Sequence, residues 1–250
     1  MAIVVGVSDV EIRAAVFAHE RRHVESIIDI DLGAILDGAD SSCLKIGKDE
    51  IDAELTRRIL PQLEDHTIKR LSIFALSRIP FICHLGYELG DKVPSVLYQK
   101  HRDDGEGWAW PDDAGDAIDF EVIEHGATDA KVPALLASVS GGDVEKVRRA
   151  TAADRILKIR PIGVAPARTL LRSPKTLEKF RAAYHQALSK IEHGFPGTTS
   201  VDYFLAVPAP VALICGRDVL RDVVPRVVVF DLVDGEYVAA TTLETRTKPA

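Results

Sequence analysis

The sequence predicts an α/β fold with largely parallel sheets, and three observations carry this prediction. Short apolar runs alternate with amphipathic stretches along the chain. A strand–helix–strand segment occurs twice. The composition, with 46% hydrophobic and 28% charged residues, supplies enough apolar material for a sizeable core and too much for a disordered chain.

The first third of the chain gives the first elements. Ser8 and Glu11 have the spacing of a helix-capping box and predict a helix over residues 9–23. Residues 25–32 and 71–77 are apolar runs that predict buried strands. Between them, an apolar residue at every fourth position predicts a helix over residues 49–65, disturbed by Pro61.

The duplicated segment is the most informative feature. Each copy predicts an apolar strand, a helix begun at a proline, a glycine inside that helix and a second strand, at 95–98 and at 226–230. A glycine inside a helix costs about 1 kcal/mol relative to alanine, so its recurrence predicts close packing of each helix against a sheet. Chance similarity between two strand–helix–strand units is the alternative. The matched pairs are Phe74 and Phe204, Pro80 and Pro210, Gly86 and Gly216, Val93 and Val223, and, after one inserted residue, Pro94 with Pro225 and Val96 with Val227.

Between the copies, residues 101–119 form a polar, acidic loop that holds both tryptophans, Trp108 and Trp110. Their spacing puts both indoles on one face if the loop is extended, where they stack on a flat base or cover the core. Residues 132–142 then predict a strand and a small-residue turn before a helix from Asp143, which places free N–H groups where a phosphate can bind. A long amphipathic helix runs from Ser173 to Gly194.

Composition excludes several classes of protein. A net charge of −7 argues against a protein that coats long nucleic acid, since that function needs a broad basic face. No apolar run approaches the roughly 20 residues that span a bilayer, and the N-terminus lacks a secretory signal, so we expect a cytoplasmic protein. Cys43, Cys83 and Cys215 are widely spaced, which predicts buried thiols rather than disulfides or a cysteine zinc site.

One catalytic motif occurs literally. His19, Glu20 and His23 spell H-E-x-x-H, which on a helix lets two imidazoles hold Zn²⁺ while the glutamate activates water, as in a metallopeptidase. Two arginines inside the motif oppose a dication, and no third ligand follows at the usual spacing, which favours a solvated helix end. We therefore expect no catalytic residue, no metal and no cofactor, with the zinc peptidase as the alternative.

The duplicated units and their surroundings resemble the SAVED domain, the sensor of bacterial CBASS and some type III CRISPR anti-phage effectors. The resemblance covers about nine tenths of the chain, and its matching segments are IIDIDLGAILD, LSIFALSRIPFICHLGYELGD, VPSVLYQ, WAW, LLASVSGG, HGFPGTTSVDYFLAVPAPVALICGR and VVVFDL. It implies two pseudo-symmetric, Rossmann-like (CARF-like) halves with mainly parallel sheets flanked by helices. We expect residues 1–24 to be an N-terminal helix and linker, 25–125 the first half and 126–250 the second.

The resemblance also implies a function. Such domains are non-enzymatic sensors that bind a cyclic tri- or tetranucleotide rich in adenine and activate an effector by oligomerisation or conformational change. Only about 24 residues precede the first expected strand, too few for a catalytic domain, so we expect a separate or missing effector and a ligand-induced homo- or hetero-oligomer. A structural scaffold that has lost ligand binding is a further alternative.

The expected site lies where strand ends of both halves meet, since ligands bind there in parallel sheets. Central cations and N–H groups would hold the phosphates, with aromatic or apolar slots for the bases. Each expected residue also has a structural reading, as a surface cation, a turn residue or a core aromatic. The expected ligand-binding residues are Asp31, Ser77, Arg78, Gln99, Lys100, Trp108, Trp110, Ser138, Ser140, Gly141, His193, Phe195 and Pro208.

Overall fold

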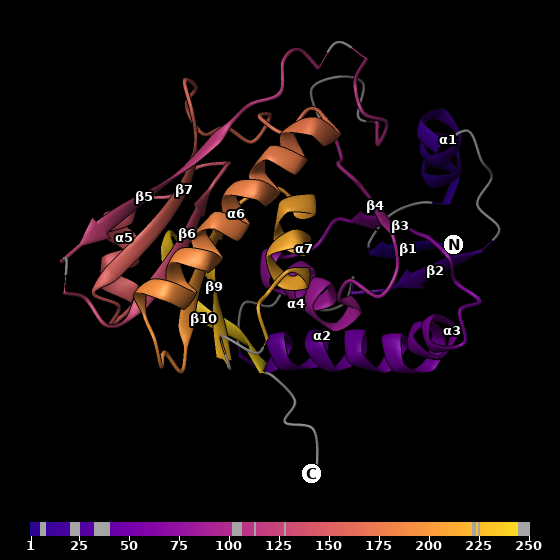
Figure 1. Cartoon of the computed structure of the whole chain (residues 1–250). Coiled ribbons are helices and arrows are strands. Elements are labelled where there is room, and N and C mark those ends of the chain that lie inside the picture. Colours follow the sequence, from indigo (N-terminus) through magenta and orange to yellow (C-terminus); the bar gives the residue numbers. More distant parts are fainter. Residues whose placement is uncertain are drawn as a thin grey trace.

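The structure is a computed structural model that describes residues 1–5, 9–20, 26–32, 41–101, 107–112, 114–127, 129–221, 224 and 226–244. Two sheets lie on either side of a central layer of helices (Figure 1). The first sheet has the order β2-β1-β3-β4, and all its strands are parallel: β1 (Ala2–Val5), β2 (Ile27–Ile30), β3 (Leu71–Ala75) and β4 (Ser95–Tyr98).

Strand β1 departs from the expectation that residues 1–24 form only a helix and linker. It lies inside the first sheet and pairs with both β2 and β3. All four of its residues are buried, Ala2 and Val4 against helix α1 (Asp9–Glu20) and Ile3 and Val5 towards the central helices. A strand buried on both faces carries no polar alternation, so such a short run gave no period to detect.

The helices of the first half follow the predicted pattern with one irregularity. The helix expected over residues 49–65 is α2 (Ser41–Glu54), a wider π-helical turn η2 (Leu55–Ile59) and α3 (Leu60–Glu64). Pro61 lies in the first turn of α3, where a missing N–H leaves no bond unmade. Helix α4 (Ile79–Leu89) is the first of the two duplicated helices.

The second sheet has the order β10-β9-β8-β6-β7-β5, with antiparallel strands at its two edges. Strand β5 therefore belongs to this sheet, although the expected boundary at 125–126 divides it. One face packs against α5 (Val144–Ala150), and the other against α6 (Pro174–Gly194) and α7 (Ala209–Arg217). The strands are β5 (Phe120–Gly126), β6 (Pro133–Ser138), β7 (Arg155–Pro161), β8 (Val201–Ala206), β9 (Arg226–Val233) and β10 (Glu236–Glu244).

The predicted start of the long helix α6 is confirmed. The Ser173 hydroxyl accepts a hydrogen bond from the Thr176 N–H at 3.2 Å, and Pro174 begins the helix. Within the described residues, no helix is both long and apolar enough to cross a bilayer.

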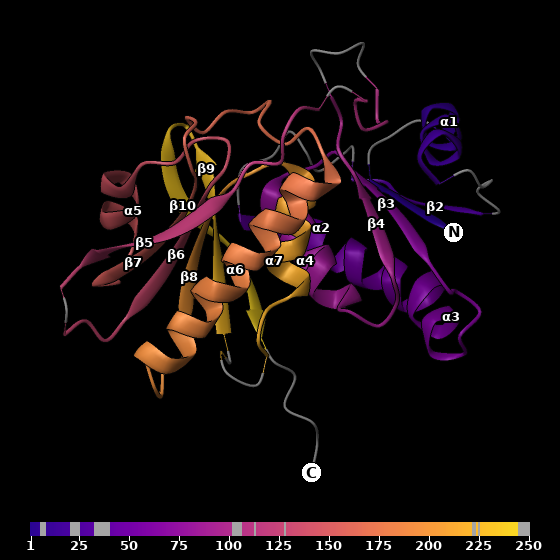
Figure 2. The same ribbon diagram turned by 45° about the horizontal axis from the view of Figure 1, so that its top comes forward.

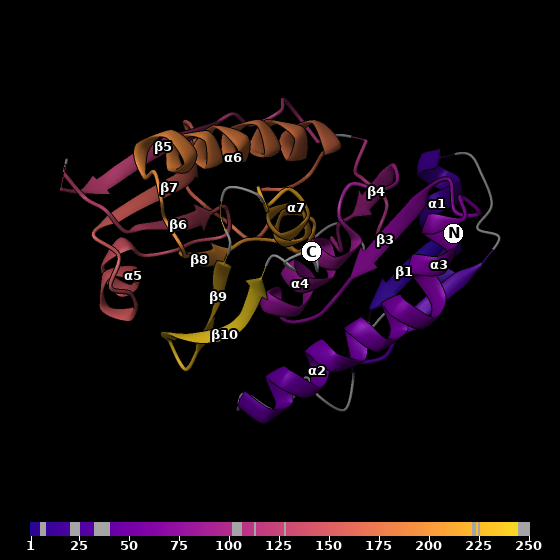
Figure 3. The ribbon, with the colours of Figure 1, turned by 60° about the horizontal axis from the view of Figure 1, so that its bottom comes forward.

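The duplicated helices α4 and α7 cross each other at the centre of the molecule (Figures 2 and 3). A Cβ on Gly86 would overlap the carbonyl oxygen of Leu213, and a Cβ on Gly216 would overlap that of Cys83. Cys83 and Leu213 are themselves equivalent in the repeat, so the contact is reciprocal, as at a two-fold interface. The glycines therefore serve helix-to-helix packing, whereas the sequence predicted helix-to-sheet packing. Val223 and Pro225 of the repeat lie outside the described residues.

The thiols follow the prediction in part. Cys83 and Cys215 are buried at this crossing and Cys43 is half-buried, and none of the three forms a disulfide. Burial raises the pKa of the Cys83 and Cys215 thiols, so neither is a reactive thiolate at neutral pH.

Three further contacts join the halves. Arg78, before α4, forms an ion pair with Asp231 of β9 at 2.7 Å. The Tyr87 hydroxyl donates to the Glu244 carbonyl at 2.7 Å, and the Arg221 guanidinium lies 4.0 Å from the centre of the Tyr87 ring. The two halves thus form one packed body.

Candidate functional site

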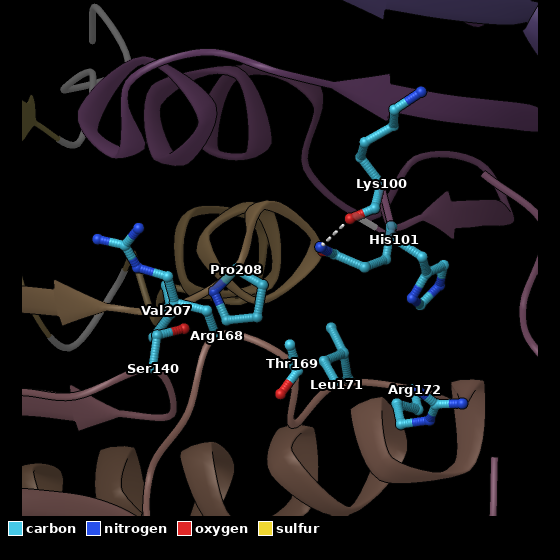
Figure 4. A pocket seen from close by; sticks show the side chains of 10 residues that line it. Lys100, His101, Ser140, Arg168, Thr169, Leu171, Arg172, Val207 and Pro208 are labelled. Atoms are coloured by element: carbon cyan, nitrogen blue, oxygen red, sulfur yellow. Dashed lines mark hydrogen bonds between the residues drawn. The ribbon is translucent and has the colours of Figure 1, made fainter. Parts of the chain in front are cut away.

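A cavity of about 540 Å³ opens where strand ends of both halves meet, and we call it the seam pocket (Figure 4). Its volume lies in the range of about 300–1,000 Å³ that is usual for ligand sites. Its lining residues are Gln99, Lys100, His101, Ser140, Arg168, Thr169, Leu171, Arg172, Val207 and Pro208.

Each wall of the seam pocket follows the carboxyl end of a strand. β4 of the first half leads into Gln99, and β6 of the second half leads into Ser140. β8 leads into Val207 and Pro208, and the segment between β7 and α6 supplies residues 168–172. Carboxyl ends of parallel strands at the boundary between two sheets are where α/β proteins bind ligands.

The turn after β6 is held rigidly against β8. The N–H groups of Val139 and Ser140 both donate to the Ala206 carbonyl, at 3.1 and 2.8 Å. The Ser138 hydroxyl donates to the carbonyl of Gly141, which has a φ of +152°. The wall that Ser140 provides is therefore fixed before any ligand arrives.

The seam pocket is electropositive. Its described lining includes Lys100, Arg168 and Arg172 and no carboxylate. In Figure 4, Arg168 lies on the side of Ser140, and Arg172 lies beyond Thr169 and Leu171 on the other side. Pro208 is the N-cap of α7, so the positive end of that helix dipole borders the same space. This arrangement suits an anion with more than one charged group.

Lys100 is anchored from outside the pocket. Its ammonium donates to the Glu11 carboxylate at 2.9 Å and lies 5.7 Å from the centre of the Trp108 ring. The hydrogen bond from Lys100 holds the pKa of the Glu11 carboxyl below its ordinary value, although burial opposes it. The Glu11 carboxylate therefore neutralises part of the positive charge of Lys100.

Gln99 offers an unsatisfied group. Its amide nitrogen donates to the Lys100 carbonyl at 2.8 Å. Its Oε1 is buried and has no hydrogen-bond partner among the described residues. A buried oxygen without a partner is costly, so a rotation of the amide that brings Oε1 to a donor is favoured.

Of the residues expected from sequence, the structure brings four together in the seam pocket: Gln99, Lys100, Ser140 and Pro208. The sequence reasoning missed His101, Arg168, Thr169, Leu171, Arg172 and Val207 as site residues. Arg172 carried one usable signal, since it immediately precedes Ser173, the N-cap of α6. The place of Arg168 and Arg172 depends on how a long connection runs over the strand ends, which the sequence pattern does not encode.

Neither tryptophan lines the seam pocket, and both pack against the apolar core. Trp108 is 2% exposed, its ring packs edge-on against Phe74, and its N–H donates to Glu11 at 3.0 Å. Its face is therefore not available to stack on a base. Trp110 is half-buried against His101, at 5.5 Å between ring centres, and stands behind the pocket wall.

Five other expected residues lie outside the pocket lining. The Arg78 guanidinium, expected to contact phosphate, is bound by Asp231 with both side chains 15% exposed. Asp31 is exposed after β2, and Ser138 is fully buried beneath the turn. The described residues offer no partner to the buried Ser77 hydroxyl, and Gly141 serves the turn itself.

His193 and Phe195 lie at the end of α6 that is farthest from the seam pocket. They follow the C-terminal end of α6, whereas Arg172 and the seam pocket adjoin its N-terminal end. At 1.5 Å per residue, the 21-residue helix separates them by about 30 Å. His193 instead bonds the Ser189 carbonyl at 2.8 Å.

The H-E-x-x-H motif does not form a peptidase site. The Glu20 side chain is 4% exposed and receives hydrogen bonds from the Ser72 and Tyr98 hydroxyls, both at 2.8 Å. It also pairs with Arg70 at 3.2 Å, so it cannot activate water at an open metal. His19 packs edge-on against Tyr98, and His23 lies outside the described residues.

A sequence profile of the SAVED family, described as the "SMODS-associated and fused to various effectors sensor domain", matches residues 51–243. The chain belongs to the SAVED family. This confirms the resemblance seen in the sequence. No curated protein matches the chain.

Solved structures share the SAVED fold. One is the Acinetobacter baumannii Cap4 SAVED/CARF-domain containing receptor with the cyclic trinucleotide 3′3′3′-cAAA, at 16% identity and a TM-score of 0.60 over 98% of this chain and 51% of that one. The same receptor with 2′3′3′-cAAA gives 16% identity and a TM-score of 0.62, over 97% and 51%. Cap4 of Moraxella osloensis gives 16% and 0.53, over 98% and 50%. The chain thus spans about half the length of these receptors.

Proposed function

We propose that the seam pocket binds a cyclic oligonucleotide second messenger, namely a cyclic tri- or tetranucleotide rich in adenine. The observation that carries the proposal is a pocket with Lys100, Arg168 and Arg172 and no carboxylate in its described lining, at the strand ends of a SAVED domain. The similarity to receptors described with cyclic trinucleotides supports the choice of ligand class.

Different residues of the pocket lining suit different chemical groups of the ligand. The two guanidinium groups of Arg168 and Arg172 are suited to bidentate bonds with phosphate oxygens. The Ser140 hydroxyl offers a further donor beside them, and the positive end of the α7 dipole favours a nearby anion. Gln99 lines the pocket, and rotation of its amide lets Oε1 accept a hydrogen bond from an exocyclic amino group, which adenine carries and uracil lacks.

We further propose that the bound ring activates an effector through oligomerisation or conformational change, and that the domain itself is not an enzyme. Both sheets contribute to the pocket wall, so a ligand that contacts all sides changes how β4 sits against β6 and β8. Coupling of this kind needs only that the ring binds one arrangement of the halves better than another.

A thermal-shift screen with cyclic di-, tri- and tetranucleotides tests the proposal. At 100 times its dissociation constant, a ligand that binds only the folded state stabilises it by about 2.7 kcal/mol. We expect an adenine-containing cyclic tri- or tetranucleotide to raise the melting temperature, and linear adenylate of equal length to do so far less. A flat response to every ring would favour a scaffold without ligand and would overturn the proposal.

A further inference from the structure

The Lys100 side chain lines the seam pocket, but its ammonium points away from the cavity (Figure 4). In this view the ammonium extends away from Pro208 and Thr169. Among the described residues, its partners are the Glu11 carboxylate of α1, at 2.9 Å, and the Trp108 ring, whose centre lies 5.7 Å away. The stem of this lysine therefore belongs to the pocket wall, while an acidic side chain of α1 holds its charge outside.

Glu11 has a second anchor besides Lys100. The same carboxylate oxygen, Oε2, accepts the hydrogen bond from Lys100 and another from the Trp108 N–H, at 3.0 Å. The indole of Trp108 is 2% exposed and packs edge-on against Phe74, so its position is fixed. The Glu11 carboxylate is therefore an anion with a fixed place behind the pocket wall, and it keeps one hydrogen bond when Lys100 leaves it.

The ion pair between Lys100 and Glu11 is suited to exchange. The Lys100 side chain is 16% exposed and that of Glu11 is 49% exposed. An ammonium shielded from water needs an anion beside it, but a pair with a half-exposed carboxylate is weak because solvent screens it. Lysine carries its charge on a flexible four-carbon stem, and rotation of that stem turns the ammonium from Glu11 towards the cavity. A phosphate group in the pocket is an anion that can replace Glu11.

We propose that Glu11 competes with the ligand for Lys100 and thereby sets the ligand concentration at which the seam pocket fills. This inference rests on the proposed function, because it needs an anionic ligand in that pocket. Without ligand, the Lys100 ammonium is bound to Glu11. When the ring binds, the ammonium passes to one of its phosphates, and Trp108 loses the cation near its ring. Glu11 is a positioning residue that acts through Lys100 and touches no ligand atom.

A double-mutant cycle tests the competition, by calorimetric titration with the ring that gives the largest thermal shift. Glu11→Gln removes the charge but keeps an acceptor for the Trp108 N–H, and we expect it to tighten binding about threefold, as the loss of a partly exposed ion pair allows. Lys100→Met should weaken binding at least about fivefold, because a charge-assisted contact to phosphate is lost. In the Lys100→Met background, Glu11→Gln should change the affinity by less than about 1.5-fold.

Glu192→Gln is the matched control. It removes the same charge from an exposed position at the end of α6 that is farthest from the seam pocket. Its affinity for the ring should equal that of the wild type, which separates competition for Lys100 from a general effect of net charge. Circular dichroism checks the fold of each variant.

Tryptophan fluorescence gives a second readout that needs no Lys100 variant. The chain has two tryptophans, so Trp110→Phe leaves Trp108 as the sole indole. We expect the ring to change the emission of Trp108 in this protein, and to change it clearly less once Glu11→Gln is added, because Lys100 is then no longer held near the indole.

The two proposals fail in different ways. Absence of binding of every ring to the wild type would overturn the proposed function. Binding to the wild type with equal or weaker affinity in Glu11→Gln would overturn the competition alone. The same tightening by Glu11→Gln in the Lys100→Met background, or the same emission change with and without Glu11→Gln, would also overturn it.

Discussion

The two copies of the duplicated unit are alike where α4 and α7 cross and different where their strands end. At the crossing, Gly86 and Gly216 receive each other's helix backbone in the same way. At the strand ends, Arg78 before α4 is bound to Asp231, whereas Pro208, at the equivalent place before α7, lines the seam pocket. The comparison teaches that the symmetric part holds the halves together, and it supports the proposal that the divergent strand ends bind the ligand.

Substitution at the crossing should have the largest effect on stability. Gly216→Ala puts a methyl group where the Cys83 carbonyl already lies, and backbone cannot move aside as a flexible side chain can. We expect a loss of about 3 kcal/mol in the free energy of unfolding, and a similar loss for Gly86→Ala. Urea denaturation measures both.

Gly194→Ala is the control, because nothing lies within 4 Å of its added Cβ. We expect it to change stability by less than about 1 kcal/mol. Equal stability of the Gly216 and Gly194 variants would show that the crossing is not the close contact described.

Arg78→Ala tests whether Arg78 stabilises the fold, as its ion pair indicates, or contributes to ligand binding. It leaves the carboxylate of Asp231, 15% exposed, without its ion-pair partner, and should cost about 1–3 kcal/mol in unfolding free energy. Because Arg78 lies outside the seam pocket lining, ligand affinity should stay within about threefold of wild type, well under the roughly 1.4 kcal/mol that a tenfold change represents. Denaturation and ligand titration of the same preparation measure the two quantities.

Arg148→Ala provides the reference for an exposed pair. Its ion pair with Glu145 is 47% and 66% exposed, and we expect a change below about 0.5 kcal/mol. A large loss of ligand affinity in Arg78→Ala with unchanged stability would restore Arg78 to the site and refute the reading of its ion pair.

The C-terminal ends of α4 and α7 also differ between the two copies. Asp218 after α7 and Glu88 near the end of α4 are equivalent in the repeat. Burial raises the pKa of the Asp218 carboxyl, but the hydrogen bond from Arg181 and the charge of Arg217 outweigh burial and lower it overall. A carboxyl with a lowered pKa in the folded state stabilises the fold above its unfolded pKa, and this contribution is lost as the pH falls through the folded value.

Asp218→Asn should therefore lower stability at pH 7, and its difference from wild type should shrink as the pH drops below the ordinary value of 3.8. Urea unfolding at pH 7, 4 and 3 measures this small effect. Asp91→Asn removes an exposed carboxylate that lines a surface cavity together with Asp218, and it serves as the control. A difference for Asp218→Asn that stays constant down to pH 3 would contradict the lowered pKa.

Most of the fold could be predicted from local patterns in the sequence. The duplication, the capped start of α6 at Ser173 and the strand Ser95–Tyr98 were all readable from residue spacing. Strand β1 was missed because its four apolar residues, buried on both faces, show no period. The antiparallel edge strands β5 and β10 were not predicted, although β10 carried a usable signal in Asp234 and Gly235, which form the tight turn from β9 with positive φ at both residues.

The site was less accessible to sequence reasoning than the fold. Gln99, Lys100, Ser140 and Pro208 follow strand ends directly, and their positions follow from the sheet rule. Arg168 and Arg172 reach the pocket through a long connection whose path depends on tertiary packing. Trp108 follows the core reading of the two that the sequence left open, because a tryptophan in a polar loop has the same sequence signature whether it faces a ligand or, as here, the core.

The most direct test of the central claim is calorimetric titration with 3′3′3′-cAAA, or with whichever ring gives the larger thermal shift. We predict one binding event in the wild type and at least about 100-fold weaker binding in the Arg168→Ala, Arg172→Ala double variant, since two charge-assisted contacts are lost. Arg148→Ala should bind as the wild type does. Wild-type affinity in the double variant would contradict the assignment of the seam pocket as the binding site.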